Sequence, residues 1–412
     1  MTMPRFTTFR RPSLALSRWL AALTTAVLLG ACGGSDEATP EVAAPLGSAA
    51  GGFVKLNPTS VMIDGRTLTP TCSKAPGTQA DFHFWARRGS VDKLVVFFEG
   101  GGACWDGGTC ALPIYTALPA NQPALFKAEI LPSDDPTKYG GMFDLTDARN
   151  PVKDWSMVYI PYCTGDIHGG SNTKAYTNPF TGQAYNIEHR GHDNFRVVLR
   201  WMQDNFKEPQ QLLVTGSSAG AYGAILNYPW VREAFPKGTA TMLADAGQGV
   251  APASFDALRN ANWNIQLASS VYGSNPQSTP TSQLVRGLAD KFTADRMAQY
   301  TTGLDLVQMQ FYDVMTNGLA GVQGTACQAW ADQMASGLLH NQMVSNFRSY
   351  VAAGSTHTLM RGTTSNANGP LYYNDESAGT PFITWLGGLL SAGGVSSVAC
   401  TECTTWQGAC PL

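Results

Sequence analysis

The chain alternates short, continuous apolar runs with longer stretches in which apolar residues recur at helical spacing. Strands buried on both sides are apolar throughout, so this alternation predicts a mostly parallel sheet with helices on both faces. A helix is predicted from near Asp193, and the stretch 260–299 is predicted to form a helical lid or insertion. The runs predicted as strands are residues 94–98, 157–160, 212–214, 241–244, 307–311 and 347–352.

Glycines, acids, a serine and a histidine follow the predicted strands. Ligands in open α/β sheets bind beyond the carboxyl ends of the strands, so these residues are expected to share one edge of the sheet. The segments are 99–102 (EGGG), 163–166 (CTGD), 216–220 (GSSAG), 245–247 (DAG), residue 313 (D) and 354–357 (GSTH).

The composition narrows the class of protein. Only 14% of the 412 residues are charged and the formal net charge is −3, so the chain lacks the basic character of a nucleic-acid-binding protein. Hydrophobic residues make up 44% of the chain, which is too many for a charge-rich disordered protein and enough for a large core.

The amino-terminal residues predict export. Residues 1–31 combine a basic start with an apolar run that is too short to span a bilayer, the pattern of a signal peptide. The run ends in Leu29-Gly30-Ala31-Cys32, which resembles a bacterial lipobox and implies a lipid on Cys32; an ordinary signal peptide with an incidental cysteine is the alternative. Because Gly33 rather than aspartate follows, we expect the outer membrane rather than the inner one, facing the periplasm or the exterior.

Three segments follow from this interpretation. Residues 1–31 form the signal peptide, and residues 32–52, rich in small and polar residues, form a flexible tether. Residues 53–412 form a single domain, which we expect to be a monomer.

Export changes the meaning of the cysteines. Eight remain after Cys32, and an even number in an oxidising compartment predicts four disulfides. A zinc site is the alternative, since Cys400 and Cys403 have CxxC spacing, but no second CxxC or histidine pair completes it. Cys104 and Cys110 are expected to close one small loop. The pairing of the other cysteines cannot be read from their spacing.

The segment Gly216-Ser217-Ser218-Ala219-Gly220 fits the pattern GxSxG between a predicted strand and a predicted helix. This is the nucleophile elbow, a turn so tight that glycines must flank the serine. Ser218 is therefore the candidate nucleophile; Ser217 lacks the symmetric glycines.

A serine hydroxyl needs a base, and the base needs an acid that fixes its tautomer. His357 alone among the six histidines follows the last predicted strand and comes last in the chain order of α/β hydrolases. Asp313, placed at the end of the predicted strand 307–311, is the preferred acid. Asp245 and then Asp305 are the alternatives.

An oxyanion hole needs backbone N–H groups beside the scissile carbonyl. Ala219, which follows the candidate nucleophile, and the glycines after the first predicted strand can supply them. This chemistry requires neither metal nor cofactor.

These residues together resemble the pectin acetylesterase and Notum family over residues 70–360. Glu99 to Trp105 resemble the family's EGGGWCW segment, and Gly216 to Gly220 resemble its GCSAG. The other matching segments are Asn150-Pro151, Trp155, Tyr162-Cys163, Gly165, Arg190-Gly191, Asp245-Ala246-Gly247 and Phe311-Tyr312-Asp313, and the departures are Ala103 for tryptophan and Thr358 for cysteine.

The resemblance implies an α/β-hydrolase-like serine esterase with Ser218, Asp313 and His357 as its triad. It implies oxyanion donors at Gly101, Gly102 and Ala219, and disulfides Cys104–Cys110 and Cys72–Cys163.

The sequence thus predicts an extracytoplasmic hydrolase of carboxylic esters, with an acetyl or short acyl group, acting on an acetylated polysaccharide or a small ester. It is expected to contact the membrane through a lipid on Cys32. The alternatives are a polyester or lipid-ester hydrolase, and a non-catalytic carbohydrate-binding protein on a hydrolase scaffold.

Overall fold

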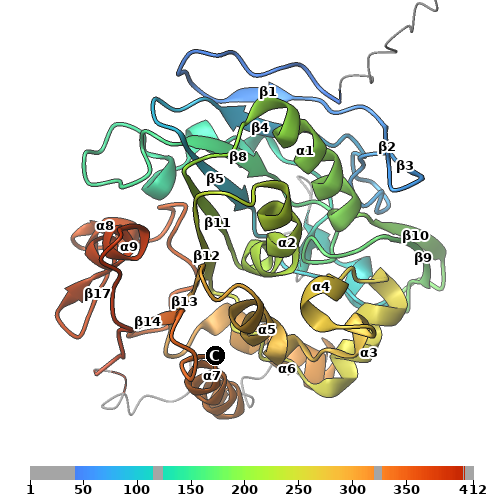
Figure 1. The fold of residues 1–412 in the computed structure, drawn as a ribbon. Coiled ribbons are helices and arrows are strands. Elements are labelled where there is room, and N and C mark those ends of the chain that lie inside the picture. The colour runs from blue at the N-terminus through green and yellow to red at the C-terminus, as the bar shows by residue number, and fades with distance from the viewer. Residues whose placement is uncertain (1–41, 115–123, 320–326, 402, 404–412) are drawn as a thin grey trace, which may run out of the picture. The chain divides into compact units, whose positions relative to one another are not determined.

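The computed structural model describes residues 42–114, 124–319, 327–401 and 403. These belong to one compact unit, Pro40–Leu412. Its central sheet has eight strands in the order β1-β4-β8-β5-β11-β12-β13-β14, parallel from β8 to β14 and antiparallel at β1 and β4 (Figure 1). The strands are β1 (Val54–Leu56), β4 (Phe84–Arg87), β8 (Ser156–Ile160), β5 (Lys93–Phe98), β11 (Gln211–Ser217), β12 (Thr239–Asp245), β13 (Arg296–Thr302) and β14 (Phe347–Ala352).

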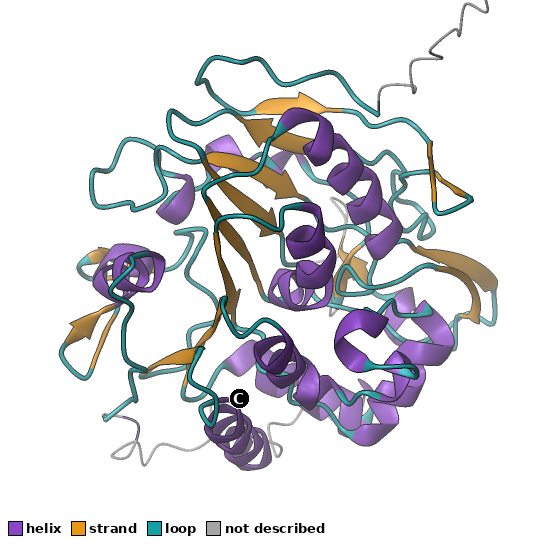
Figure 2. Ribbon diagram, viewed as in Figure 1, coloured by secondary structure: helices purple, strands orange, loops and turns teal. Residues whose placement is uncertain are grey.

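Helices and small hairpins surround this sheet (Figure 2). The helices are α1 (Gly191–Asn205), α2 (Ala219–Ala234), α3 (Ala253–Trp263), α4 (Ser269–Tyr272), α5 (Leu284–Lys291), α6 (Leu306–Asn317), α7 (Cys327–Asn341), α8 (Leu371–Asn374) and α9 (Phe382–Leu390). The remaining short strands are β2 (Val61–Ile63), β3 (Arg66–Leu68), β6 (Pro113–Ile114), β7 (Phe126–Lys127), β9 (Asn172–Thr177), β10 (Ala184–His189), β15 (Ser365–Asn366), β16 (Gly369–Pro370), β17 (Glu376–Ser377) and β18 (Thr380–Pro381).

Strand β5 shows why the predicted strands are apolar throughout. Leu94, Val96 and Phe98 pack into the core that includes α1 and α2. Val95 and Phe97 pack into a second core on the other face, which includes residues of α8 and α9. Because successive side chains of a strand point to opposite faces, a strand covered on both sides must be apolar at every position.

The α/β fold predicted from the sequence is confirmed, and five of the six predicted strands are present as β5, β8, β11, β12 and β14. The strand predicted at 307–311 is wrong, because these residues lie in α6. The true strand at this place in the sheet is β13, which begins at Arg296 within the stretch expected to be helical. The rest of that stretch contains the end of α3, α4 and α5.

The predicted tether ends earlier than expected. Val42 and Ala43 are buried, and the carbonyl of Ala44 accepts a hydrogen bond from the indole N–H of Trp201 on α1 at 3.0 Å. The amide of Leu46 donates to the side chain of Asn205 at 2.7 Å. The boundary at residue 52 is therefore corrected: at least residues 42–46 pack on the domain. The signal peptide and Cys32 lie outside the described residues.

Both disulfides implied by the family resemblance are present, Cys72–Cys163 and Cys104–Cys110. Cys400 and Cys403 are also joined, so this CxxC pair does not offer two free thiolates to a zinc ion. Cys327 is disulfide-bonded as well. No helix among the described residues is long and apolar enough to cross a membrane.

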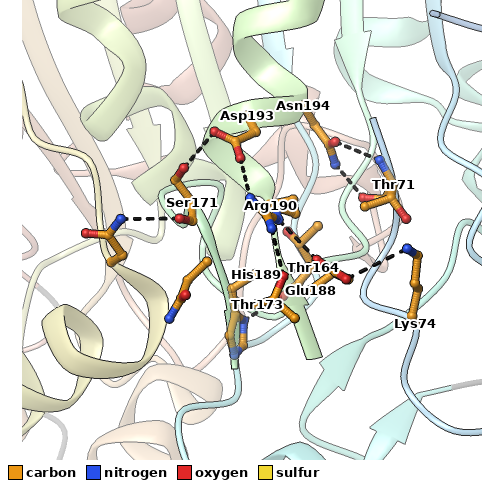
Figure 3. Close-up of polar contacts among 12 residues, drawn as sticks. Thr71, Lys74, Thr164, Ser171, Thr173, Glu188, His189, Arg190, Asp193 and Asn194 are labelled. Atoms are coloured by element: carbon orange, nitrogen blue, oxygen red, sulfur yellow. Dashed lines mark hydrogen bonds and ion pairs between the residues drawn. The ribbon is translucent and has the colours of Figure 1, made fainter. Parts of the chain in front are cut away.

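The segment before α1 forms a closed polar network. Arg190 lies 3.1 Å from both Glu188 and Asp193, and Ser171 donates a hydrogen bond to Asp193 at 2.8 Å (Figure 3). Lys74 lies 3.7 Å from the other oxygen of Glu188. These charges are paired with one another, so the network fixes the hairpin β9–β10 against the start of α1.

Candidate active site

Ser218 stands in a sharp turn between β11 and α2. Its backbone has φ 60° and ψ −124°, a conformation that L-residues rarely adopt. A Cβ on Gly216 would lie 2.2 Å from the carbonyl oxygen of Gly220, and one on Gly220 would lie 1.9 Å from that of Phe98. The two glycines of the GxSxG pattern are therefore required by close backbone contacts, as the sequence predicts.

His357 follows β14, and its Nδ1 atom lies 2.8 and 2.9 Å from the two carboxylate oxygens of Asp305. Because Asp305 accepts from Nδ1–H, the neutral imidazole keeps its lone pair on Nε2. This Nε2 atom is buried and has no hydrogen-bond partner among the described residues. His357 and Ser218 line the same cavity, so the free nitrogen is available to a group bound beside Ser218.

Asp305 replaces Asp313 as the partner of the histidine, which corrects the preferred assignment from the sequence. Asp313 lies two turns into α6, is 1% exposed, and accepts a hydrogen bond from Asn317 at 2.6 Å. The rule that the acid follows a strand holds, since Asp305 comes three residues after β13. The strand that precedes the acid is β13 and not residues 307–311, which lie in α6.

A local signal for Asp305 exists in the sequence. Asp305 is the N-cap of α6, and its side chain accepts a hydrogen bond from the amide of Gln308 at 3.0 Å. The side-chain amide of Gln308 donates to the other carboxylate oxygen at 2.9 Å. An aspartate followed three residues later by glutamine is a helix-start signature, and it would have changed the predicted strand into a helix.

The two segments that carry the acid and the histidine are bound to each other. Strands β13 and β14 are parallel neighbours. At the end of β13, the hydroxyl of Thr302 donates to the backbone carbonyl of Thr356 at 2.9 Å. Just beyond it, the amide of Leu306 donates to the backbone carbonyl of Ser355 at 3.2 Å. The sheet and these hydrogen bonds together bring Asp305 and His357 into contact.

The glycine segment after β5 passes directly against the serine turn. A Cβ on Gly100 would lie 2.9 Å from the Cβ of Ser218. Gly102 has φ +71°, and a Cβ there would lie 2.0 Å from a backbone oxygen. Among the described residues, the N–H groups of Gly101 and Gly102 donate to no other backbone group. The N–H of Ala219 begins α2 and has no partner within the helix.

The cavity beside Ser218 is small and mostly apolar. Its volume is about 70 Å³, and Gly102, Ser218, Ala219 and His357 are among the residues that line it. Further lining residues are Ala103, Trp105, Ile167, Tyr222, Ala246, Val250, Ala251, Phe255, Thr281, Val307, Gln308, Phe311, Met315 and Trp330.

A group of charged side chains around the buried Glu99 stabilises the glycine segment 100–102. Glu99 is fully buried, and its carboxylate lies 2.7 Å from Lys127 and 3.1 Å from Arg361. Burial alone would raise the pKa of Glu99, but the two cations outweigh it and hold this pKa below its usual value. The Lys127 ammonium also lies 2.6 Å from Asp134, whose pKa burial and the charge of Glu99 raise to about 6.

The other histidines lie outside the cavity. His168 has a structural role. His168 is 2% exposed, its Nε2 atom lies 2.8 Å from the carbonyl oxygen of Glu99, and burial lowers its pKa to about 4. His189 lies near Cys104 and Cys110, but these cysteines form a disulfide and cannot ligate a metal as thiolates.

The fold and this site define an α/β-hydrolase-like protein with a serine, a histidine and an aspartate beyond the carboxyl ends of three strands. Residues 69–313, more than half of the chain, match the model of the pectinacetylesterase family. The chain belongs to this family.

Individual relatives agree with this assignment. The chain is 28% identical over 171 residues to the human palmitoleoyl-protein carboxylesterase Notum, which is 40% of this chain and 31% of that protein. It is 28% identical over 176 residues to pectin acetylesterase 7 of Arabidopsis thaliana, 42% of this chain and 41% of that protein. The matched regions therefore span less than half the length of these relatives.

A solved structure shows the same fold. The Wnt deacylase Notum from Drosophila aligns with a TM-score of 0.52 and 17% identity, over 80% of this chain and 93% of that one. At this identity the similarity concerns the fold alone.

Proposed function

We propose that this protein is a serine esterase that hydrolyses carboxylic esters of short acyl groups through an acyl-serine intermediate. The observation that carries the proposal is the shared cavity of Ser218 and His357, with the histidine held by Asp305. The strained backbone of Ser218 supports it further, because such strain is typical of nucleophile elbows. Family membership supports the same class of reaction.

In this mechanism His357 Nε2 accepts the proton of the Ser218 hydroxyl as its oxygen attacks the ester carbonyl. The N–H groups of Gly101, Gly102 and Ala219 stabilise the resulting oxyanion. The imidazolium gives its proton to the leaving alcohol, which leaves acyl-Ser218. Water then attacks this ester, His357 takes one of its protons, and the acid is released as Ser218 is protonated again. Asp305 stabilises the imidazolium in both halves of the reaction.

The size of the cavity supports a short acyl group. An engineered protein cavity of about 150 Å³ holds benzene, which has six carbons. The cavity beside Ser218 has a volume of about 70 Å³, which favours an acetyl or similarly short group over a sixteen-carbon chain. One kind of relative is named as a palmitoleoyl-protein carboxylesterase and the other as a pectin acetylesterase. The size of the cavity favours the smaller, acetyl-like group for this protein.

The amino terminus and the cysteines support a location outside the cytoplasm. Disulfides such as Cys72–Cys163 persist in oxidising compartments. The proposal includes cleavage before Cys32 and a lipid on that residue, so that the enzyme acts at the outer membrane as a monomer.

The test is hydrolysis of nitrophenyl esters of increasing acyl length by the purified protein. We expect the highest kcat/KM with acetate or butyrate and a large loss by palmitate. A fluorophosphonate should label Ser218, and Ser218→Ala should abolish both labelling and hydrolysis. Ser270→Ala, at an exposed serine, is the matched control and should retain both activities.

Two results would contradict the proposal. If Ser218→Ala retained full esterase activity, the nucleophile would be wrong. If palmitate were hydrolysed as efficiently as acetate, the argument from cavity size would fail while the serine mechanism would stand.

A further inference from the structure

We propose that Asp245 is a positioning residue that holds the turn of Ser218 and the segment of His357 in register, without taking part in proton transfer. This inference rests on the proposed function, because it concerns the alignment of that nucleophile and that base.

Asp245 lies between the two segments and contacts both. It ends β12 and is fully buried. Its Oδ2 atom accepts a hydrogen bond from Ser217 Oγ at 2.6 Å on the nucleophile side. The same atom accepts from the amides of Leu359 and Met360 at 3.1 and 3.0 Å on the histidine side. One carboxylate oxygen thus joins segments that are more than a hundred residues apart in the chain.

The backbone of Asp245 adds a further link. Its carbonyl oxygen accepts from the amide of Ser218 at 2.8 Å. The carboxylate therefore holds the residue before the nucleophile while the carbonyl holds the nucleophile itself. On the other side, the two amides bound by Oδ2 follow His357 by two and three residues.

Strained backbone surrounds this contact. Ser218, Ala246 and Thr358 all have positive φ, at 60°, 63° and 59°. Each is the chain neighbour of a residue in the network: Ser218 follows Ser217, Ala246 follows Asp245, and Thr358 precedes Leu359. Such conformations are unfavourable and persist only where the surroundings fix them. For threonine, which is branched at Cβ, a positive φ is especially unusual. The hydrogen bonds to Asp245 supply that fixation.

The geometry also argues against Asp245 as the acid of the triad, which is one of the alternatives that the sequence offers. Both carboxylate oxygens of Asp305 already lie within 2.9 Å of His357 Nδ1. The second oxygen of Asp245, Oδ1, is buried and has no hydrogen-bond partner in the described part of the chain. Burial raises the pKa of this carboxyl, with the hydrogen bond from Ser217 opposing the shift.

The free Oδ1 atom makes a discriminating experiment possible. In Asp245→Asn, the amide oxygen can accept from the same three donors while the NH₂ group takes the place of Oδ1. In Asp245→Ala all three donors lose their acceptor. A positioning role therefore predicts that asparagine rescues what alanine loses. A displacement of about 1 Å at reacting atoms can cost about 10²-fold in rate.

We expect Asp245→Ala to lower kcat for nitrophenyl acetate by about 10²-fold with little change in KM, measured per active site titrated with a fluorophosphonate. Asp245→Asn should recover kcat to within about tenfold of the wild type. In the His357→Ala background, where no base remains to be aligned, Asp245→Ala should cause almost no further loss of the residual rate.

The matched control is Asp295→Asn. Asp295 is a buried acid that precedes β13 at the opposite end of the sheet and binds Arg232 and Tyr228. Its replacement should lower thermal stability without changing kcat per titrated site. If Asp245→Ala fails to fold, Ser217→Ala is the deciding variant. It removes only the hydrogen bond on the nucleophile side and should still lower kcat severalfold.

The inference is overturned if folded Asp245→Ala, or Ser217→Ala in its place, keeps kcat within twofold of the wild type. It is also overturned if the loss is as large in the His357→Ala background as in the wild type. Failure of the proposed function has a different signature, namely a wild-type protein that hydrolyses no ester or does so without Ser218.

Discussion

Asp305 binds His357 and begins helix α6 with the same carboxylate. Its oxygens lie 2.8 and 2.9 Å from Nδ1 of His357, and one of them also accepts from the amide of Gln308. We predict that Asp305→Asn lowers kcat by about 10⁴-fold, because an amide favours the wrong imidazole tautomer. Steady-state kinetics with nitrophenyl acetate measures the effect.

Asp313→Asn, two turns further along the same helix, is the matched control. It should change kcat by less than about tenfold, because Asp313 contacts Asn317 rather than His357. The opposite ranking of the two variants would return the acid to Asp313.

The ion pair between Arg361 and the buried carboxylate of Glu99 joins the histidine segment to the glycine segment. We predict that Glu99→Gln lowers the free energy of unfolding by about 3 kcal/mol, since Arg361 loses the carboxylate that it pairs with and Lys127 keeps only Asp134 as a counter-ion. Urea unfolding monitored by tryptophan fluorescence measures this loss. Glu376→Gln, at an exposed position, should change stability by less than about 0.5 kcal/mol. Equal effects of the two variants would show that the ion pairs of Glu99 add nothing to the free energy of unfolding.

The two disulfides near the site should differ in their contribution to stability. Cys72 and Cys163 are separated by 91 residues, whereas Cys104 and Cys110 are separated by 6. The chain-entropy model gives about 4–5 kcal/mol for the long loop and about 2 kcal/mol for the short one. Replacing each pair by serines and comparing the free energies of unfolding tests this order. A larger loss from the short loop would show that local strain or packing, rather than chain entropy, dominates.

Buried histidines should make the protein unstable in acid. Burial lowers the pKa of His168 and His192 to about 4 and that of His189 to about 3. In the unfolded chain these groups bind protons near pH 6.5. Below that pH the unfolded state therefore binds protons that the folded state does not bind. The free energy of unfolding falls as the pH decreases toward 4.

Several acids act in the opposite direction. Burial raises the pKa values of Asp134, Asp166 and Asp375 to about 6 and also raises that of Asp245, so the folded state binds their protons first and gains stability as the pH falls through 6. The pKa of His83 is likewise lowered to about 4, and the histidine shifts are the larger ones, so we predict a net loss of stability between about pH 6.5 and 4.5. Urea unfolding at several pH values and constant ionic strength measures it. A free energy of unfolding that is constant or rises toward pH 4.5 would refute the prediction.

Met315 narrows the cavity beside Ser218, and its removal should admit longer acyl groups. We predict that Met315→Ala raises the ratio of nitrophenyl hexanoate to nitrophenyl acetate hydrolysis, measured as kcat/KM, by about tenfold. Each additional buried methylene contributes about 0.8 kcal/mol, so two of them account for such a factor. Met343→Ala, at a side chain that is 75% exposed and outside the cavity, is the control and should leave the ratio unchanged. An unchanged ratio in Met315→Ala would place the limit on acyl length elsewhere.

Elements with local signals can be predicted from the amino-acid sequence alone. The continuous apolar run of β5 and the GxSxG turn identify the central strands and Ser218, because burial on two faces and a tight turn restrict the residue types directly. Chain order and the position after the last predicted strand single out His357 as the candidate base. The glycines after β5 were likewise recognisable, since only glycine fits where the backbone passes against Ser218.

The acid that binds His357 and the partners of Asp245 depend on the tertiary structure. Strand β13 contains polar residues such as Gln299, which is buried because its side chain binds the carbonyl of Gly247 and the side chain of Asn341. A strand whose polar side chains form hydrogen bonds with distant residues shows no continuous apolar run. The strand before Asp305 therefore could not be predicted from the sequence. Asp245 acquired its partners only when β11, β12 and the histidine segment came together. Hydrogen bonds between residues far apart in the chain leave no periodic pattern, and their geometry is set by the packing of the whole sheet.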